Sequence, residues 1–282
     1  MVKANNTIFL FYLAMMDFFG EYLSEKYPQS SSIEDTKHYQ TVIIMKIVRM
    51  FHSLELLTKG TLDEVSARCL LRGILDSVTA YSFVYQREDE NDMLFRHYLY
   101  ALDGWREYKK SVISISEENE YKDKEDYACD YVIKQIEEKL HNHPFYKKGG
   151  SNARKITQSA KWNYESLQNP RSLKYREMYT LVGIDSNLTK YFQGYLSQFA
   201  HGLCLSNKPT STEIMKSVLY ESIVLADKLI QAICWTFNDQ KMVDSFLDSD
   251  IIKSFLNSKD FNIDDLAEFT TALVRKDKII LI

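Results

Sequence analysis

The chain has 282 residues, of which 45% are hydrophobic and 26% charged, and its formal net charge is −4. This balance is typical of a globular protein with ample core, and it excludes a protein that is strongly basic or strongly acidic as a whole. The 9 glycines and 4 prolines are too few for the many turns of an all-β fold of this size.

Prolines mark the predicted helix boundaries, because proline inside a helix removes a hydrogen bond and clashes with the preceding turn. All four lie between periodic segments, at Pro28, Pro144, Pro170 and Pro209. Hydrophobic periodicity predicts helices over 6–26, 33–58, 62–87, 91–113, 122–142, 172–181, 186–205 and 211–238, with shorter ones over 240–256 and 263–275. Helix starts are supported by "SSSIED", "TLDE" and "TSTEI", in which a Ser or Thr cap precedes early acids.

No stretch alternates between apolar and polar residues as a half-buried strand does. The sequence therefore predicts an all-α fold, a multi-helix bundle of about eight to ten helices. We expect one helical bundle domain over residues 1–240 and an appended C-terminal helical element over 241–282.

The cysteines and the N-terminal segment indicate the cellular compartment in which we expect the protein. The four cysteines, Cys69, Cys129, Cys204 and Cys234, share no CxxC spacing, and we expect reduced thiols in a cytoplasmic protein. The apolar segment "TIFLFYLAMMDFFGEYL" lacks the features of a signal peptide, and Asp17 interrupts it. No uncharged run reaches the roughly 18–20 residues of a transmembrane helix, so no membrane insertion is expected.

The segment from His143 to Arg176 is predicted to be irregular, because Gly149 and Gly150 interrupt any helix there. It is also locally basic, with Glu165 the one acid between Lys147 and Arg176. Such a loop attracts an anionic partner such as RNA or a nucleotide. The alternative is a solvated loop that balances neighbouring acids. The candidate nucleic-acid-binding residues are Lys147, Lys148, Arg154, Lys155 and Lys161.

A polar stripe runs along the predicted helix 62–87, opposite its apolar face. Arg68, Arg72, Asp76 and Thr79 follow one another at spacings of three or four, so they are neighbours on the helix surface. Apolar residues flank the stripe, which favours a face that lines a cleft. The alternative is an exposed face on which Arg72 and Asp76 form an ordinary surface ion pair.

His201 stands near the end of the predicted helix 186–205, on the side that carries Gly194, Ser197 and Cys204. One interpretation makes His201 a general acid or base, with Arg68 or Arg72 brought near by folding. The other makes it a histidine at a helix contact, bonded to Ser197, a tyrosine or a carbonyl. A thiol–imidazole pair with Cys204 would lack a third residue to orient the ring.

The sequence predicts neither a metal site nor a cofactor. His141 and His143 are two residues apart, a spacing that diverges on a helix, and no carboxylates accompany them in a metal-binding pattern. Glycine-rich phosphate loops and the usual hydrolase motifs are also missing from the sequence.

Four segments together resemble an uncharacterised bacterial all-helical family, a domain of unknown function. They are "SARCLLRGILDSVTAYSFVY", "AKWNYESL", "REMYTLVG" and "YFQGYLSQFAHG", within approximately residues 40–205. The pattern of that family falls on Arg68, Trp162, Tyr191, Tyr195, Ser197 and His201. The family often has an acid one turn after its arginine, where this chain has Arg72.

That family in turn looks similar to HEPN-type helical domains of bacterial defence and toxin–antitoxin systems. Active members of that group are metal-independent ribonucleases with an Arg-x4–6-His motif at a homodimer interface. No arginine lies four to six residues before His201 here, so the arginine would come from another helix.

The resemblance implies an effector that cleaves or binds RNA. In it, His201 would take the 2′-hydroxyl proton while an arginine stabilises the charged phosphorane. The expected partners are RNA and a second copy or another protein of a defence system. The alternative is a non-catalytic interaction or regulatory subunit, in which the same polar residues only hold helices together. The implied catalytic set is His201, Arg72, Arg68, Asp76, Ser197 and Tyr195.

Overall fold

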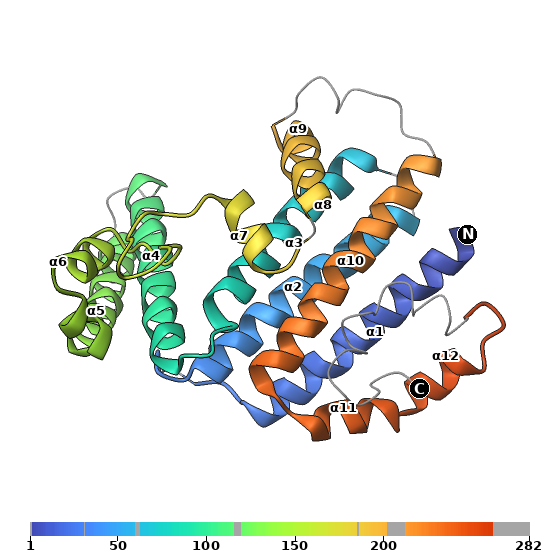
Figure 1. Cartoon of the computed structure of the whole chain (residues 1–282), viewed down its shortest axis with the longest axis horizontal. Helices are drawn as coiled ribbons and strands as arrows, with labels where there is room; N and C mark the ends of the chain where they lie inside the picture. Colours follow the sequence, from blue (N-terminus) through green and yellow to red (C-terminus); the bar gives the residue numbers. More distant parts are fainter. Residues whose placement is uncertain are drawn as a thin grey trace. The chain divides into compact units, whose positions relative to one another are not determined.

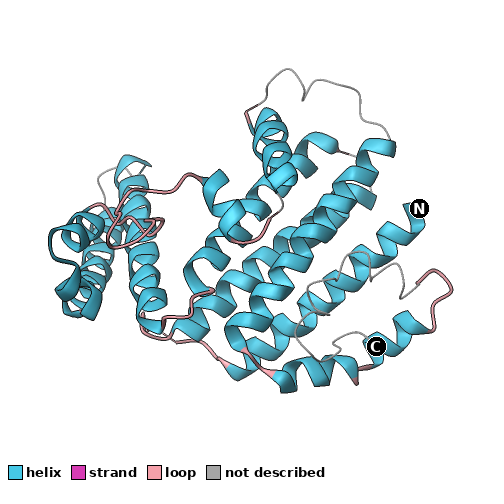
Figure 2. Ribbon diagram, in the orientation of Figure 1, coloured by secondary structure: helices cyan, strands magenta, loops and turns pink. Residues whose placement is uncertain are grey.

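The computed structural model describes residues 2–30, 32–59, 63–115, 120–184, 186–201 and 212–261. Across these ranges the chain is built of helices joined by loops and contains no strand (Figures 1 and 2). The prediction of an all-α multi-helix bundle is therefore confirmed. None of the helices in this part of the chain is long and apolar enough to cross a membrane.

The chain divides into two compact units. Unit 1 comprises Met1–Ser30, Lys37–Ser82 and Tyr179–Ile282, and unit 2 comprises Ser31–Thr36 and Phe83–Met178. The predicted C-terminal element lies within unit 1, and the domain boundary expected at residue 240 stays a prediction.

Unit 1 is organised around the long helices α1 (Val2–Lys26), α2 (Thr36–Lys59), α3 (Glu64–Tyr85) and α10 (Thr212–Phe237). Helix α1 packs along α10 (Figure 1). Short helices complete the unit: α8 (Ser186–Tyr191), α9 (Ser197–Ala200), α11 (Gln240–Leu247) and α12 (Asp250–Leu256). Helix α7 (Tyr175–Leu181) begins in unit 2 and ends in unit 1.

Aromatic side chains join the C-terminal helices to α1. The Phe11 ring lies 6.1 Å from Phe246 of α11 and 5.3 Å from Phe255 of α12, and Phe19 lies 5.7 Å from Phe246. Edge-on contacts at these distances add to the burial of large apolar surface. Phe11, Phe19 and Phe246 are almost fully buried, so α11 belongs to the core of unit 1.

Unit 2 contains α4 (Glu90–Ile115), α5 (Glu120–Asn142) and α6 (Pro144–Gln158). The buried Arg96 side chain on α4 orders the loop after α6, because its guanidinium donates to the carbonyl oxygens of Trp162 and Tyr164 at 3.1 and 2.8 Å. The Trp162 ring packs edge-on against Phe83 and Tyr100. The polar and aromatic side chains around this loop therefore serve its packing and satisfy the hydrogen-bonding needs of its backbone.

Helix α6 corrects the prediction of an irregular segment from residue 143 onward. Pro144 occupies the first turn, and His143 accepts a hydrogen bond from the Phe145 N–H through Nδ1 at 3.1 Å. Proline and an N-cap acceptor both favour a helix start. Gly150 does leave helical geometry, with φ 54° and ψ −129°, so the glycines kink the segment rather than abolish the helix.

The predicted helix 186–205 is also interrupted. After α8 the chain forms a π-helix, η1 (Phe192–Leu196), and then α9, which ends at Ala200. The predicted helix 240–256 is split into α11 and α12 around Asp248 and Ser249. The predicted helix 263–275 and Cys204 lie outside the described residues.

Candidate functional site

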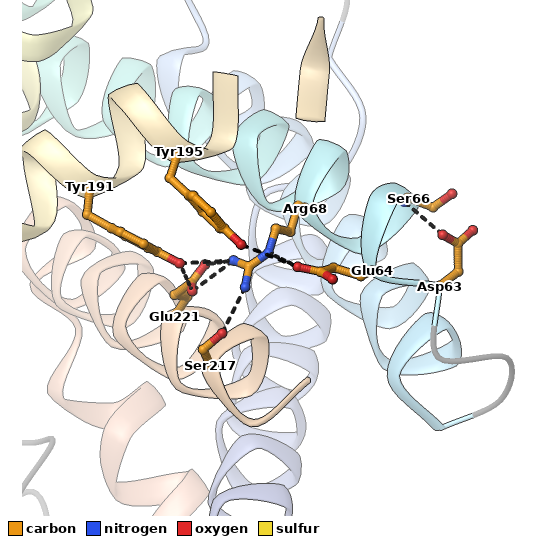
Figure 3. Close-up of polar contacts among 8 residues, drawn as sticks. All are labelled: Asp63, Glu64, Ser66, Arg68, Tyr191, Tyr195, Ser217 and Glu221. Carbon is orange, nitrogen blue, oxygen red and sulfur yellow. Dashed lines mark hydrogen bonds and ion pairs between the residues drawn. The ribbon is translucent and has the colours of Figure 1, made fainter. Parts of the chain in front are cut away.

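Arg68 lies at the centre of a buried polar network in unit 1, between α3, α10 and η1 (Figure 3). The residue is only 1% exposed. Its Nε donates to Glu64 at 2.9 Å, one Nη donates to Glu221 at 3.0 Å and to Tyr191 at 3.1 Å, and the other Nη donates to Ser217 at 2.8 Å. Every nitrogen of the guanidinium is therefore bonded to the protein.

Two tyrosines of the π-helix region cover this guanidinium. The ring of Tyr195 lies 4.5 Å from the Arg68 Cζ and stacks on Tyr191 with centroids 5.0 Å apart. The Tyr191 hydroxyl donates to Glu221 at 2.8 Å, and the Tyr195 hydroxyl donates to Glu64 at 3.4 Å. π-Helical turns are rare and costly. Here the turn accompanies the placement of the Tyr195 ring over the cation and of the Tyr191 hydroxyl within hydrogen-bonding distance of it.

The network carries two carboxylates for one guanidinium. Glu64 and Glu221 are 3% and 2% exposed, so neither is screened well by water. Burial raises the pKa of the Glu221 carboxyl, although Arg68 and Tyr191 oppose that shift. For Arg68, desolvation works against the charge, but Glu221 and Glu64 outweigh it and hold the guanidinium pKa above its usual value. The arginine is therefore held in its charged form by the carboxylates around it.

The start of α3 explains why Glu64 reaches Arg68. Asp63 accepts a hydrogen bond from the Ser66 N–H at 3.1 Å, which begins the helix at Glu64 (Figure 3). Hydrogen bonds from Ser66 lower the pKa of the Asp63 carboxyl. Glu64 then stands four residues before Arg68, which is the spacing that lets two helical side chains meet.

Arg72 and Asp76 form a second polar group, one turn further along α3. Their side chains are 19% and 29% exposed and are joined at 3.0 Å. Buried Tyr179 donates its hydroxyl to Asp76 at 2.6 Å, and Arg72 donates to the Ser197 hydroxyl at 3.4 Å. Of the predicted catalytic set, folding thus brings Arg72, Asp76 and Ser197 together at a half-exposed position.

His201 is the C-cap residue of α9, and it is exposed. Its backbone N–H bonds to the Ser197 carbonyl at 3.1 Å, so it stands one helical turn beyond the serine that Arg72 contacts. Its imidazole forms no hydrogen bond to the residues that the structure describes. Within the described residues, the interpretation in which the His201 side chain bonds to Ser197 or a tyrosine is therefore wrong.

Helix α6 in unit 2 displays the predicted basic residues. Ala153, Ile156 and Thr157 are its buried residues, whereas Lys147, Lys148, Arg154 and Lys155 are exposed. Many cations of unit 2 are neutralised, as in Arg106–Glu137 and Lys109–Asp130. Exposed Lys147, Lys148, Arg154 and Lys155, with half-exposed Lys161, form no ion pair within the described ranges. We call these five residues, of which Lys161 lies in the loop that follows α6, the α6 basic face.

His141 and His143, the two histidines beside α6, make separate contacts with residues of that helix. Nδ1 of buried His143 caps α6, while the exposed His141 ring packs edge-on against Tyr146 with centroids 4.8 Å apart. Among the described residues, no group of three or more His, Cys, Asp or Glu side chains is placed to hold a metal ion.

Sequence reasoning missed Glu64, Glu221, Ser217 and Tyr179. Glu64 had a local signal, because an acid four residues before an arginine on a helix predicts an ion pair. Glu221 and Ser217 are 153 and 149 residues from Arg68, and no local pattern relates them.

No protein-family model, no curated protein and no solved structure matches this chain. The chemistry that the chain can perform must therefore be argued from the geometry of these three groups of residues.

Proposed function

We propose that this protein binds RNA through the α6 basic face. The observation that carries the proposal is the set of basic side chains that are accessible and lack carboxylate partners within the described residues. The whole chain has a net charge of −4, so this local excess of positive charge is not a consequence of overall composition. Uncompensated lysines and arginines on one face are the electrostatic signature of a phosphate-binding surface.

Arg68 has no part in RNA contact in this proposal. The Arg68 guanidinium is 1% exposed and every nitrogen donates to the protein, so it is not accessible to a phosphate in solution. We assign it to the support of unit 1, together with Tyr195. The resemblance to HEPN-type domains adds the expectation that RNA binding serves a bacterial defence or toxin–antitoxin system.

Reversal of charge on α6 is expected to weaken RNA binding by 10-fold or more. The variant Lys147→Glu/Lys148→Glu removes two phosphate contacts and adds two repulsive charges. The measurement is fluorescence anisotropy with a labelled RNA at several salt concentrations, with Lys147→Ala/Lys148→Ala alongside. Each lost phosphate contact should reduce the slope of log affinity against log salt by roughly 1.

The matched control is Lys241→Glu/Lys253→Glu, which makes the same change of charge at exposed positions of α11 and α12. It should retain RNA affinity within about 2-fold, because long-range charge effects are screened at physiological salt. Equal losses in both variants would show only a response to net charge and would contradict binding through α6.

A second candidate function is RNA cleavage, favoured by the contact between Arg72 and Ser197. Partly exposed Arg72 contacts Ser197, and exposed His201 follows that serine by one helical turn. In the reaction, His201 would accept the 2′-hydroxyl proton as the 2′-oxygen attacks phosphorus. The 5′-oxygen would leave with a proton from a general acid, giving a 2′,3′-cyclic phosphate, while Arg72 stabilises the phosphorane.

Cleavage is expected to fall by at least 100-fold in His201→Ala, since removal of a general acid or base typically costs that much. Arg72→Ala should lose activity as well, while both variants keep their helical circular dichroism and their RNA affinity. The measurement is gel analysis of RNA incubated with each protein. Intact RNA with the wild type under conditions of saturated binding would leave the protein as a non-catalytic RNA-binding subunit.

A further inference from the structure

An aromatic pair stands directly before the α6 basic face. His141 ends α5, Tyr146 lies in the first turn of α6, and their rings are in edge-to-face contact with centroids 4.8 Å apart. His141 is exposed and Tyr146 is half-exposed, and neither polar group is hydrogen-bonded to the described residues. Lys147 and Lys148 follow Tyr146 immediately in the chain.

We infer that this corner between α5 and α6 binds single-stranded RNA, with an unpaired base stacked on the Tyr146–His141 pair and the adjoining phosphates on Lys147 and Lys148. The inference rests on the proposed function and names the form of RNA that the surface takes. Stacking on aromatic rings beside cations is the usual means by which proteins hold unpaired nucleotides.

The aromatic rings distinguish a single strand from a duplex. In a duplex the bases are stacked on one another, so a protein contacts mainly phosphates, 2′-hydroxyls and groove edges. An exposed ring pair at the end of a row of lysines would add nothing to such contacts. An unpaired base has two open faces, and the Tyr146 hydroxyl and the His141 ring nitrogens offer hydrogen bonds to its edge.

The kink in α6 extends the same surface. Gly150 is exposed, and a Cβ built on it would meet nothing within 4 Å. Its backbone is therefore open to close approach, and in the chain it follows Lys147 and Lys148 and precedes Arg154 and Lys155. A strand that leaves the aromatic pair can pass the glycine and reach the second pair of cations.

The test compares a labelled RNA of about 12 nucleotides, within the site sizes of known single-strand binders, with the same RNA annealed to its complement. The full chain should bind the single strand at least 10-fold more tightly than the duplex. Tyr146→Ala should weaken single-strand binding by roughly 5- to 100-fold and change duplex binding by less than 2-fold. Tyr146→Phe, which retains the ring, should keep most of the affinity.

The variants separate failure of this inference from failure of the proposed function. Equal affinity for the two RNAs, with losses only in Lys147→Ala/Lys148→Ala, would overturn the aromatic site and leave RNA binding by α6 in place. Binding of neither RNA by the wild type would overturn both. His141→Ala removes the other ring of the pair, which lies on α5. A folding defect confined to Tyr146→Ala would therefore not lower the single-strand affinity of both variants. A loss of single-strand affinity in His141→Ala supports the site, and unchanged affinity in both aromatic variants overturns it.

Discussion

Replacement of Arg68 by alanine is expected to lower the free energy of unfolding of unit 1 by about 3–5 kcal/mol, the cost typical of a broken buried ion pair. The change leaves Glu64 and Glu221, at 3% and 2% exposure, without their shared cation. It also removes the cation on which the Tyr195 ring lies. Urea unfolding followed by circular dichroism measures the loss.

A triple variant separates charge from packing in this network. Glu64→Gln, Arg68→Met and Glu221→Gln together remove all three charges and keep similar side-chain volumes, so most of the lost stability should return. Arg72→Ala is the control on the same helix, because it breaks a partly exposed pair, and it should cost about 1 kcal/mol or less. If Arg68→Ala and Arg72→Ala cost the same, the network does not support unit 1 as described.

Asp227→Asn is expected to raise the free energy of unfolding by about 3 kcal/mol near pH 7.5 and to change it little near pH 4. Asp227 is 6% exposed on α10 and accepts hydrogen bonds from the Tyr12 hydroxyl of α1, at 3.1 Å, and from the Gln231 side-chain amide. Burial raises the pKa of its carboxyl from 3.8 to about 6. At about 1.36 kcal/mol for each pKa unit, this shift corresponds to about 3 kcal/mol.

The sign follows from proton binding. Between pH 4 and 6 the folded protein holds a proton on Asp227 that the unfolded chain has lost, so a rise in pH weakens folding over that interval. Asparagine stays neutral, and the variant should lack this dependence. The unfolding free energies of variant and wild type are measured at pH 4 and at pH 7.5. The difference between the two proteins should be larger at pH 7.5. Tyr12→Phe should cost more above pH 6 than near pH 4, because it removes a donor to the ionised carboxylate.

The sequence pointed to the arginines of the two polar groups on α3, but not to their partners or their arrangement. The sequence grouped Arg68 with Arg72, because both lie on one polar stripe of α3. The structure separates them: Arg68 is buried under Tyr195, while Arg72 is half-exposed beside Ser197. Helical periodicity tells which residues share a face, but it does not tell which helix will cover each turn of that face.

The all-α class and most helices follow from local patterns in the chain, because a helix is held by hydrogen bonds between residues four apart and its boundaries follow from proline, caps and periodicity. The sequence also showed the excess of basic residues between Lys147 and Arg176. Only the tertiary structure decided that α6 is a kinked helix, since its buried side needs partners from elsewhere in unit 2. It likewise decided which cations are neutralised, because Arg68 meets Glu221 across 153 residues while Lys147 meets no carboxylate among the described residues. Pairing across such separations depends on how helices pack, and no local pattern in the chain encodes it.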